Sequence, residues 1–325
     1  MLGRIFSAAS LLPTVLCGAR IDAGGCLLRG GSEYLIYEAC EYRDSFLHFS
    51  PTCAIITNIE LDHTDYFSSL SQLEESFSAS VADAECAVIS VDYPAARRVA
   101  SILGKRALTI SALDGSEYRY LVLSRTPGGA EVALLHREKE LLSFRISVGG
   151  EYNIANASIA ALAALSQGVS PSAIVDGLRE FRGIEKRMER LGSLGGTEIY
   201  RDYAHHPGEI RAVLGSIKAL CGSVGVVFRP HTYTRTRDLW GGFVKELSSA
   251  DELAICDIYP AREDPIDGVS AQALARDIKG AVAIPTDEAV RFIRSFSSRA
   301  VILMGAGDLD SAEREISALI KGEIK

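Results

Sequence analysis

Short apolar runs, each followed by polar residues, recur through the first half of the chain. Such runs are typical of buried strands in an α/β sheet, which deliver polar side chains at their carboxyl ends. They predict strands at 34–37, 53–56 and 86–89. Three further runs within 118–147 are separated by turn residues such as Thr126-Pro127-Gly128-Gly129, and they predict antiparallel strands along one side of the sheet. Helices are predicted from 153 to about 167 and from 172 to about 181.

From about Leu191 onward, strand-like and helix-like segments alternate regularly. The predicted strands are 198–203, 224–228, 253–258, 282–285 and 300–304, with helices such as 208–220 and 238–248 between them. This βα repetition predicts a mostly parallel sheet with helices on both faces. The chain turns polar and basic near 183–190, and 325 residues fit about two domains. We therefore expect an α/β protein with domains at 1–184 and 185–325.

The first eighteen residues have two interpretations. Arg4 followed by an apolar stretch resembles a weak secretory signal peptide. The alternative is an amphipathic helix stopped by Pro13, with an apolar face made of Ile5, Ala8, Ala9 and Leu12.

Composition excludes several classes of protein. Lys plus Arg number 34 and Asp plus Glu number 42, so the net charge of −8 argues against a nucleic-acid partner. No apolar run approaches the roughly 18 residues of a membrane-spanning helix, so no membrane partner is expected. The seven cysteines are irregularly spaced without a CxxC pair, which favours reduced thiols in a cytoplasmic protein over disulfides or a zinc site.

Two acid-rich segments follow predicted strands. Glu38-Ala39-Cys40-Glu41-Tyr42-Arg43-Asp44 comes after one strand, and Thr57-Asn58-Ile59-Glu60-Leu61-Asp62-His63-Thr64-Asp65 comes after the next. In doubly wound sheets ligands bind at the carboxyl ends of strands, and carboxylates there suit Mg²⁺, which prefers oxygen ligands. The segments are therefore either a shared metal site, to which His63 could add, or solvated charged loops.

Two cation-rich segments occupy equivalent places in the second half. In Arg201-Asp202-Tyr203-Ala204-His205-His206-Pro207 the paired histidines suit an anion, a metal or a carboxylate, but they lack the HExxH spacing of a metalloprotease. In the segment 229–238, three arginines and His231 stand at a strand-to-helix turn. Arginine forms bidentate bonds to phosphate, and a helix N-terminus adds its dipole, so we interpret this segment as a phosphate clamp.

Gly305-Ala306-Gly307-Asp308 follows the last predicted strand. A Gly-x-Gly pair suggests a dinucleotide-binding oxidoreductase, but the third glycine is missing and the motif closes the domain instead of opening it. A backbone turn near a ligand is the simpler interpretation.

Taken in this order, the clusters resemble the Mur ligase family. The resemblance covers essentially all 325 residues, and it is carried by Glu38–Glu41, Asp44–Leu47, Thr57–Glu60 with Asp62, His63 and Asp65, Asn153 with Asn156-Ala157, Lys186-Arg187, Asp202–Pro207, His231–Arg237, Tyr259–Glu263 and Gly305–Gly307. Within the family, 202–207 and 230–238 are most similar to the members that add L-alanine.

The resemblance implies a fold and an activity. The fold is a central ATPase-type domain with a mixed, mostly parallel sheet, followed by a Rossmann-like, doubly wound C-terminal domain. The activity is a step in peptidoglycan precursor synthesis with ATP and Mg²⁺ as cofactors. ATP phosphorylates the muramoyl carboxylate of UDP-N-acetylmuramate, and the amine of L-alanine then attacks the acyl phosphate. Mg²⁺ and cationic side chains stabilise the charge on the transferring phosphoryl group.

The resemblance also implies roles for individual residues. Glu38 and His63 would hold Mg²⁺, and Asn153 would lie against the ATP purine with Asn156 close by. The residues that line the cleft between domains and hold the substrate carboxylate and phosphates would be Arg187, Tyr203, His205, His231 and Arg235. Two positions depart from the family pattern, since Cys40 stands where many members have Asp and Tyr152 where many have His.

The phosphate-binding P-loop of the family, G-x-x-G-K-T-[ST], does not occur in these 325 residues. Lys105 follows Gly104, but Arg106 comes next. Residues 1–18 resemble the segment just after the P-loop, which favours the helix over the signal peptide, and the N-terminal UDP-binding domain is also not found. We expect a central sheet that is incomplete at its N-terminal side and completed by a partner or a further N-terminal segment. We also expect this chain to be inactive alone, whether it is an expressed fragment, the product of a misplaced gene start or a truncated protein.

Two other functions remain open from the sequence. One is a related ligase that recycles murein tripeptide onto UDP-N-acetylmuramate. The other is a non-catalytic binding or scaffold protein that kept the fold.

Overall fold

The computed structural model describes residues 1–21, 25–64, 66–113, 115–126, 128–306 and 309–322. The chain forms two compact units, Met1–Ile184 and Glu185–Lys325. Within the described residues, no helix is both long and apolar enough to cross a membrane. Four residues that the sequence analysis named lie outside the described part: Asp65, Pro127, Gly307 and Asp308.

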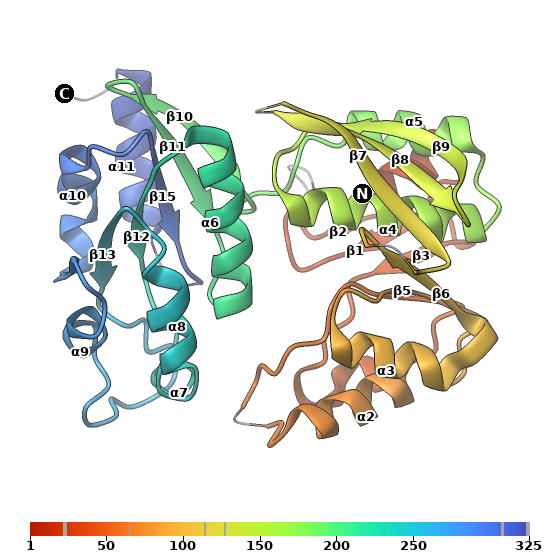
Figure 1. Ribbon diagram of the computed structural model, residues 1–325, viewed down its shortest axis with the longest axis horizontal. Coiled ribbons are helices and arrows are strands. Elements are labelled where there is room, and N and C mark those ends of the chain that lie inside the picture. The colour runs from red at the N-terminus through yellow and green to blue at the C-terminus, as the bar shows by residue number, and fades with distance from the viewer. Residues whose placement is uncertain (22–24, 65, 114, 127, 307–308, 323–325) are drawn as a thin grey trace. The chain divides into compact units, whose positions relative to one another are not determined.

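The first unit contains two sheets (Figure 1). In the smaller one, β1 (Thr14–Leu16) pairs antiparallel with β2 (Leu27–Leu28) and parallel with β3 (Leu35–Tyr37). The larger sheet has the order β4-β5-β6-β7-β8-β9. Its strands are β4 (Cys53–Ile56), β5 (Cys86–Ser90), β6 (Ala107–Ser111), β7 (Tyr118–Thr126), β8 (Gly129–His136) and β9 (Lys139–Ile146). Strands β4 to β7 are parallel and β7 to β9 antiparallel, which confirms the mixed, mostly parallel sheet.

The run at 34–37 forms a strand, but the strand is not buried as expected. It is β3, at the edge of the smaller sheet, and Leu35 is 59% exposed there. The run at 53–56 forms β4, at the edge of the larger sheet. An apolar run does not tell a central strand from an edge strand, because both have the same local pattern.

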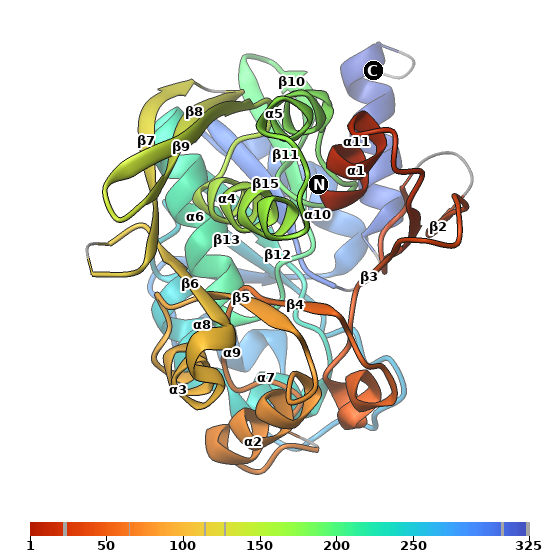
Figure 2. The ribbon, with the colours of Figure 1, turned by 90° about the vertical axis from the view of Figure 1, so that its right-hand side faces the viewer.

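Helices cover both faces of the larger sheet. On one face lie α2 (Leu70–Ser80) and α3 (Pro94–Leu103), whose apolar side chains share a core with β4 and β5. The other face is covered by α4 (Glu151–Ser166) and α5 (Pro171–Glu180), with α1 (Leu2–Ala8) packed beside α5 (Figure 2). Short 3-10 helices span Tyr42–His48 and Gly104–Arg106.

The N-terminal helix forms, but its boundary and its buried face differ from the expectation. It ends at Ala8, because Ser10 and Leu12 have positive φ values of 60° and 46°. The buried side chains are Ile5 and Phe6, whereas Ala8 and Leu12 are exposed. Helix α1 comes so close to α5 that a Cβ at Gly177 would lie 2.4 Å from the Cα of Ile5.

The second unit is a doubly wound sheet with the order β10-β11-β15-β12-β13-β14. Its strands are β10 (Glu189–Leu194), β11 (Thr197–Asp202), β12 (Val224–Phe228), β13 (Glu252–Cys256), β14 (Ala281–Ile284) and β15 (Ala300–Met304). Only β10 is antiparallel to its neighbour. Long apolar runs such as β12 and β15, in which every residue is buried, form the middle of the sheet.

Helices flank this sheet on both sides (Figure 1). The second unit contains α6 (Pro207–Cys221), α7 (Tyr233–Asp238), α8 (Trp240–Leu247), α9 (Ala271–Arg276), the 3-10 helix Thr286–Glu288, α10 (Ala289–Ser295) and α11 (Asp310–Lys321). The helix expected at 238–248 is confirmed as α8, and a separate helix, α7, precedes it and ends at Asp238. The start of α7 was missed because Thr232, with a φ of 65°, turns the chain into a helix of mostly polar residues.

Candidate functional site

The carboxyl ends of four strands meet at one edge of the second unit's sheet. Strands β11, β15, β12 and β13 are parallel neighbours, so the loops that follow them leave from the same edge. These loops contain Tyr203 and His205 after β11, His231 after β12 and Tyr259 after β13. This edge is therefore where the second unit gathers its chemistry-bearing side chains.

Four aromatic rings form a row along this edge, which we call the ring row: Tyr203, His205, His231 and Tyr259. The ring centroids of successive members are 5.3, 6.2 and 5.6 Å apart. The last pair, His231 and Tyr259, is stacked with an angle of 23° between the planes. Aromatic rings at these separations are in contact, so three loops distant in sequence build one surface.

Three arginines lie against the ring row. The guanidinium carbon of Arg187 is 5.7 Å from the Tyr203 ring centroid, and that of Arg229 is 5.2 Å from the Tyr259 ring centroid. Arg235 donates from Nη1 to Nδ1 of His231 over 3.0 Å. Three guanidinium groups thus lie along the ring row, which suits an anionic ligand.

Backbone bonds join the loops after β12 and β13. The amide of Thr232 donates to the carbonyl of Tyr259, and the amide of Tyr259 donates to the carbonyl of Pro230, both over 2.8 Å. Glu263 accepts from the amide of Thr234 over 2.8 Å and also from its hydroxyl. The loop after β13 therefore sets the position of His231 and of α7, which contains Arg235.

Asp202, at the end of β11, is a buried carboxylate with two backbone partners. It accepts from the amide of Met188 over 2.6 Å and from the amide of Ala204 over 2.7 Å. Burial raises the pKa of Asp202 to about 6, against the lowering effect of these amides and of the charge on Arg187. Asp202 thus shapes the two loops that contain Arg187 and His205.

Glu209, in the first turn of α6, connects several site residues. It accepts from the amides of His205 and His206 over 2.9 and 3.2 Å, which completes a capping box at the start of the helix. Its carboxylate also lies 3.3 Å from Nη1 of Arg187 and 3.4 Å from Nδ1 of His205.

Gly305 explains the glycine motif after β15. A Cβ at Gly305 would lie 2.3 Å from the carbonyl oxygen of Arg229, and its φ is 140°. Only glycine lets β15 end so close to the loop that contains Arg229. Close packing against the backbone therefore accounts for Gly305. Two other residues of the motif, Gly307 and Asp308, lie outside the described residues.

In the first unit, the acid-rich segments after β3 and β4 contact each other. Nε2 of His63 lies 3.3 Å from Oε1 of Glu41, and the His63 ring lies 4.7 Å from that of Tyr42. This hydrogen bond to His63 lowers the pKa of Glu41. Asp44 accepts from the hydroxyl of Tyr66 over 2.6 Å. The two segments therefore form a connected network.

The two expected Mg²⁺ ligands have different partners in this structure. Glu38 accepts from the amide of Gly18 over 2.7 Å, and His63 faces Glu41. Among the described residues, no three His, Cys, Asp or Glu side chains come together as a metal cluster. Mg²⁺ in phosphate-transfer sites is commonly held by one or two carboxylates plus phosphates and water. The exposed carboxylate of Glu38 and the half-buried carboxylate of Glu41 fit that donor set, whereas nitrogen from His63 is the weaker match.

Asn153 and Asn156 lie one turn apart at the start of α4. Asn153 is buried and donates from Nδ2 to the carbonyl of Gly149 over 2.7 Å, while Asn156 is half-buried. Their shared face of the helix would place both amides at one location.

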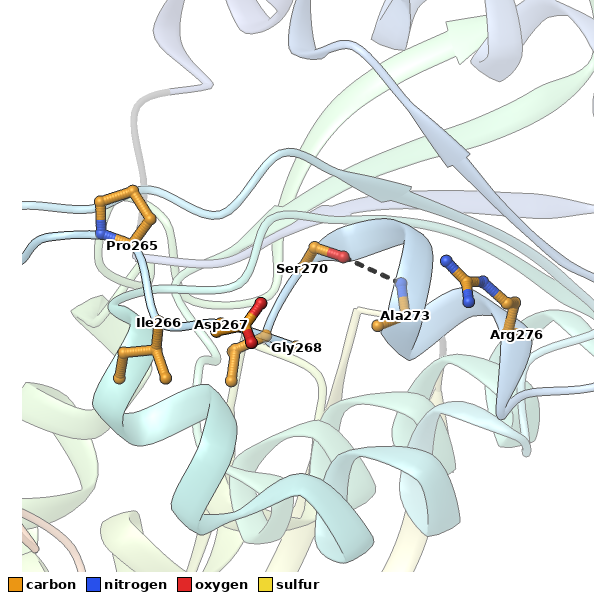
Figure 3. A pocket seen from close by; sticks show the side chains of 8 residues that line it. Pro265, Ile266, Asp267, Gly268, Ser270, Ala273 and Arg276 are labelled. Carbon is orange, nitrogen blue, oxygen red and sulfur yellow. Dashed lines mark hydrogen bonds between the residues drawn. The ribbon is translucent and has the colours of Figure 1, made fainter.

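A pocket of about 560 Å³ lies on the second unit, and the sequence singled out none of the residues that line it. It is lined by 265–270, Ala273 and Arg276, and Figure 3 shows Ser270 capping α9 beside it. None of the ring row lines this pocket. The chemistry of the ring row and its arginines therefore identifies the candidate site better than this concavity does.

Sequence reasoning gave no individual role to Glu209 or Tyr259. Glu209 stands three residues after His206, which is the capping-box spacing, but histidine is not among the usual N-cap residues. Tyr259 has no local signal that would place it on His231, because their sequence separation hides the contact.

Two family models match the chain. The Mur ligase middle domain matches residues 26–164, and the Mur ligase glutamate ligase domain matches residues 186–309. UDP-N-acetylmuramate–L-alanine ligase of Caldicellulosiruptor saccharolyticus is 37% identical over 287 residues, which are 86% of this chain and 63% of that protein. The enzyme of the same name from Aquifex aeolicus is 34% identical over 95% of this chain and 70% of its own length.

Solved structures have the same fold. The alanine ligase MurC of Thermotoga maritima superposes with a TM-score of 0.81 and 24% identity over 99% of this chain and 72% of its own. The murein peptide ligase of Psychrobacter arcticus has a TM-score of 0.68 and 19% identity over all of this chain and 74% of its own. This chain thus spans 63% of the Caldicellulosiruptor protein and roughly three quarters of these solved chains. Since matched domains and relatives cover nearly its whole length, the chain belongs to the Mur ligase family.

Proposed function

We propose that this chain is the middle and C-terminal part of an ATP-dependent ligase that joins L-alanine to UDP-N-acetylmuramate. The observation that carries the proposal is the ring row, built from the segments after β11, β12 and β13, together with the three arginines that lie against it. Cationic and polar groups at the carboxyl edge of a parallel sheet suit a ligand with carboxylate and phosphate groups. The relatives named as L-alanine ligases support the choice of substrate.

In this proposal the residues of the second unit bind the anionic groups. Arg187 and Arg235 hold the muramoyl carboxylate and the phosphoryl group that is transferred to it, and His231 is oriented by Arg235. Tyr203 and His205 line the position where the amine of L-alanine attacks the acyl phosphate. Charge accumulates on the phosphoryl oxygens in such a transfer, so fixed guanidinium groups lower the barrier.

The residues of the first unit are proposed to bind the nucleotide and its metal ion. Glu38 and His63 hold Mg²⁺, and Asn153 with Asn156 lies against the purine. Bound Mg²⁺ neutralises phosphate charge during the transfer. For Nε2 of His63 to bind a metal ion, its contact with Glu41 has to open.

We further propose that a strand from outside these residues completes the first unit. Strands β3 and β4 each form the edge of a separate sheet, and both are followed by the acid-rich segments. A strand between them would join the two sheets and satisfy two rows of backbone groups. The strand that leads into a P-loop could fill this place, and so could a strand from a partner chain.

The test compares this chain alone with the same chain preceded by the P-loop segment and N-terminal domain of the Aquifex aeolicus relative. Phosphate release and product mass are measured with ATP, Mg²⁺, UDP-N-acetylmuramate and L-alanine. We expect ligation by the extended chain, none by this chain alone, and none by an extended chain whose P-loop Lys is replaced by Ala.

Other outcomes identify the alternatives. Turnover of murein tripeptide in place of L-alanine would show the recycling ligase, which the superposition on a murein peptide ligase over the whole chain keeps as a candidate. Calorimetric binding of UDP-N-acetylmuramate by the extended chain with neither amine turned over would show a binding protein.

A further inference from the structure

The hydrogen-bond partners of His205 determine which of its nitrogens bears a proton. Nδ1 lies 2.9 Å from the carbonyl oxygen of Tyr203 and 3.4 Å from Oε2 of Glu209. A carbonyl oxygen and an ionised carboxylate can only accept. Nδ1 therefore carries the proton when the ring is neutral, and Nε2 is then the basic nitrogen.

His231, the next ring in the row, is held in the opposite tautomer. Its Nδ1 is 3.0 Å from Nη1 of Arg235, and a guanidinium can only donate. Nδ1 of His231 is therefore the acceptor, and Nε2 carries the proton. Two imidazoles with centroids 6.2 Å apart thus present one basic nitrogen and one N–H donor.

Glu209 is the charged group that acts on the first of these rings. Its carboxylate accepts hydrogen bonds from the backbone amides of His205 and His206. It also lies close to Nδ1 of His205 and to the guanidinium of Arg187. Burial alone would raise the pKa of Glu209, but His205, the two amides and Arg187 lower it below its ordinary value. The carboxylate therefore stays ionised near neutral pH, as a negative charge 3.4 Å from Nδ1 of His205.

We propose that Glu209 is a positioning residue, which fixes His205 with a basic Nε2 and holds Arg187 beside Tyr203. This inference rests on the proposed function. In the ligation step, Nε2 of His205 takes a proton from the ammonium group of L-alanine. The freed nitrogen lone pair forms the C–N bond to the acyl carbon, and the carbon–oxygen bond to phosphate breaks, with its electron pair leaving on the phosphate. The departing phosphate takes up the second proton that the nitrogen loses as the amide forms.

The first experiment determines the tautomers of His205 and His231 and does not require catalytic activity. Long-range ¹H–¹⁵N correlation spectra of the 325-residue chain are recorded at a pH where the rings are neutral, and His205→Asn and His231→Asn assign the two signals. We expect a protonated Nδ1 for His205 and a protonated Nε2 for His231. In Glu209→Gln, whose amide can also donate, the Nδ1-protonated share of His205 should fall. A His205 protonated at Nε2 in the unaltered chain would overturn the inference.

The second experiment uses the extended chain of the preceding section. Glu209→Gln should lower kcat for ligation by about 100-fold, because a shifted imidazole and arginine no longer meet the reacting atoms. KM for ATP should stay within about threefold, and Glu209→Asp should restore part of kcat. The matched control is Glu198→Gln, which removes a different Arg–Glu pair, Arg190–Glu198 on β10 and β11. Circular dichroism checks that every variant is folded.

The two ways of failing can be told apart. A folded Glu209→Gln variant with the kinetics of Glu198→Gln would overturn the positioning role while the ligase stands. An extended chain without ligase activity would overturn the proposed function, and the spectra would still decide whether Glu209 fixes the tautomer of His205.

Discussion

Arg235 and His231 form a hydrogen bond in which only the arginine can donate, with Nη1 of Arg235 3.0 Å from Nδ1 of His231. The two residues are four positions apart in the chain, His231 in the loop after β12 and Arg235 on α7. The bond orients the imidazole and at the same time fixes the guanidinium beside the ring row. Arg235 therefore supplies both a positive charge and the hydrogen bond that orients His231. We expect a substitution that keeps only the charge to impair the site.

Arg235→Lys should therefore lower kcat/KM for ligation by the extended chain by about 10- to 100-fold, the range for a lost hydrogen bond to or from a charged group. Lysine keeps the charge but loses the planar fork. Arg291→Lys is the control, since Arg291 on α10 pairs with Glu288 of the preceding 3-10 helix and its side chain is 81% exposed. Equal kinetics for the two variants would show that Arg235 acts only as a charge.

Asp202 should make the second unit less stable as the pH rises from about 4 to about 6. Its pKa is raised to about 6 in the folded chain from an ordinary value of 3.8, so the folded state binds more protons than the unfolded state within this range. Stability due to this carboxyl is complete below pH 4 and is lost as the pH rises through 6.

The measurement is urea unfolding followed by the fluorescence of Trp240, the only tryptophan, which lies on α8. Between pH 4 and 6 the unfolding free energy of the unaltered chain, minus that of Asp202→Asn, should fall by up to about 3 kcal/mol. Asp176→Asn, an exposed carboxylate of the first unit, should show no such change. A constant difference for Asp202→Asn would mean that its carboxyl titrates normally.

Gly177→Ala should destabilise the first unit, although alanine is the better helix former. The added Cβ would lie 2.4 Å from the Cα of Ile5, so α1 and α5 have to separate. Overpacking of this kind costs about 1–3 kcal/mol, more than the gain in helix propensity. Gly215→Ala in α6 is the matched control, because its Cβ meets no atom within 4 Å, and it should raise stability by up to about 1 kcal/mol. Thermal unfolding followed by circular dichroism compares the two, and a stabilised Gly177→Ala would disprove the close contact.

Removal of divalent metal should stop ligation by the extended chain. Glu38→Gln should raise the Mg²⁺ concentration needed for half-maximal rate, because the amide oxygen is a weaker ligand than the carboxylate. Glu33→Gln, an exposed carboxylate just before β3, is the control and should leave this concentration unchanged. The readout is phosphate release during titration with Mg²⁺ after treatment with EDTA. An unchanged Mg²⁺ requirement in Glu38→Gln would remove Glu38 from the metal site.

Much of the fold was readable from local pattern. Strands β4, β12 and β15 have the predicted boundaries, because unbroken apolar runs bounded by polar residues leave little choice of structure. Helices α2 and α3 and strand β6 escaped prediction. The segment of β6 mixes buried and half-buried positions, so its pattern resembles neither a fully buried nor a cleanly alternating strand.

The sequence by itself determined the family, the order of the elements and the places where polar segments follow strands, because these depend on near neighbours along the chain. Only the tertiary structure decided that β3 and β4 belong to different sheets, that His63 faces Glu41, and that Glu209 binds Arg187 and His205 together. Those relationships join residues through strand order and packing, and packing follows from the summed burial of many side chains. No local pattern records that sum.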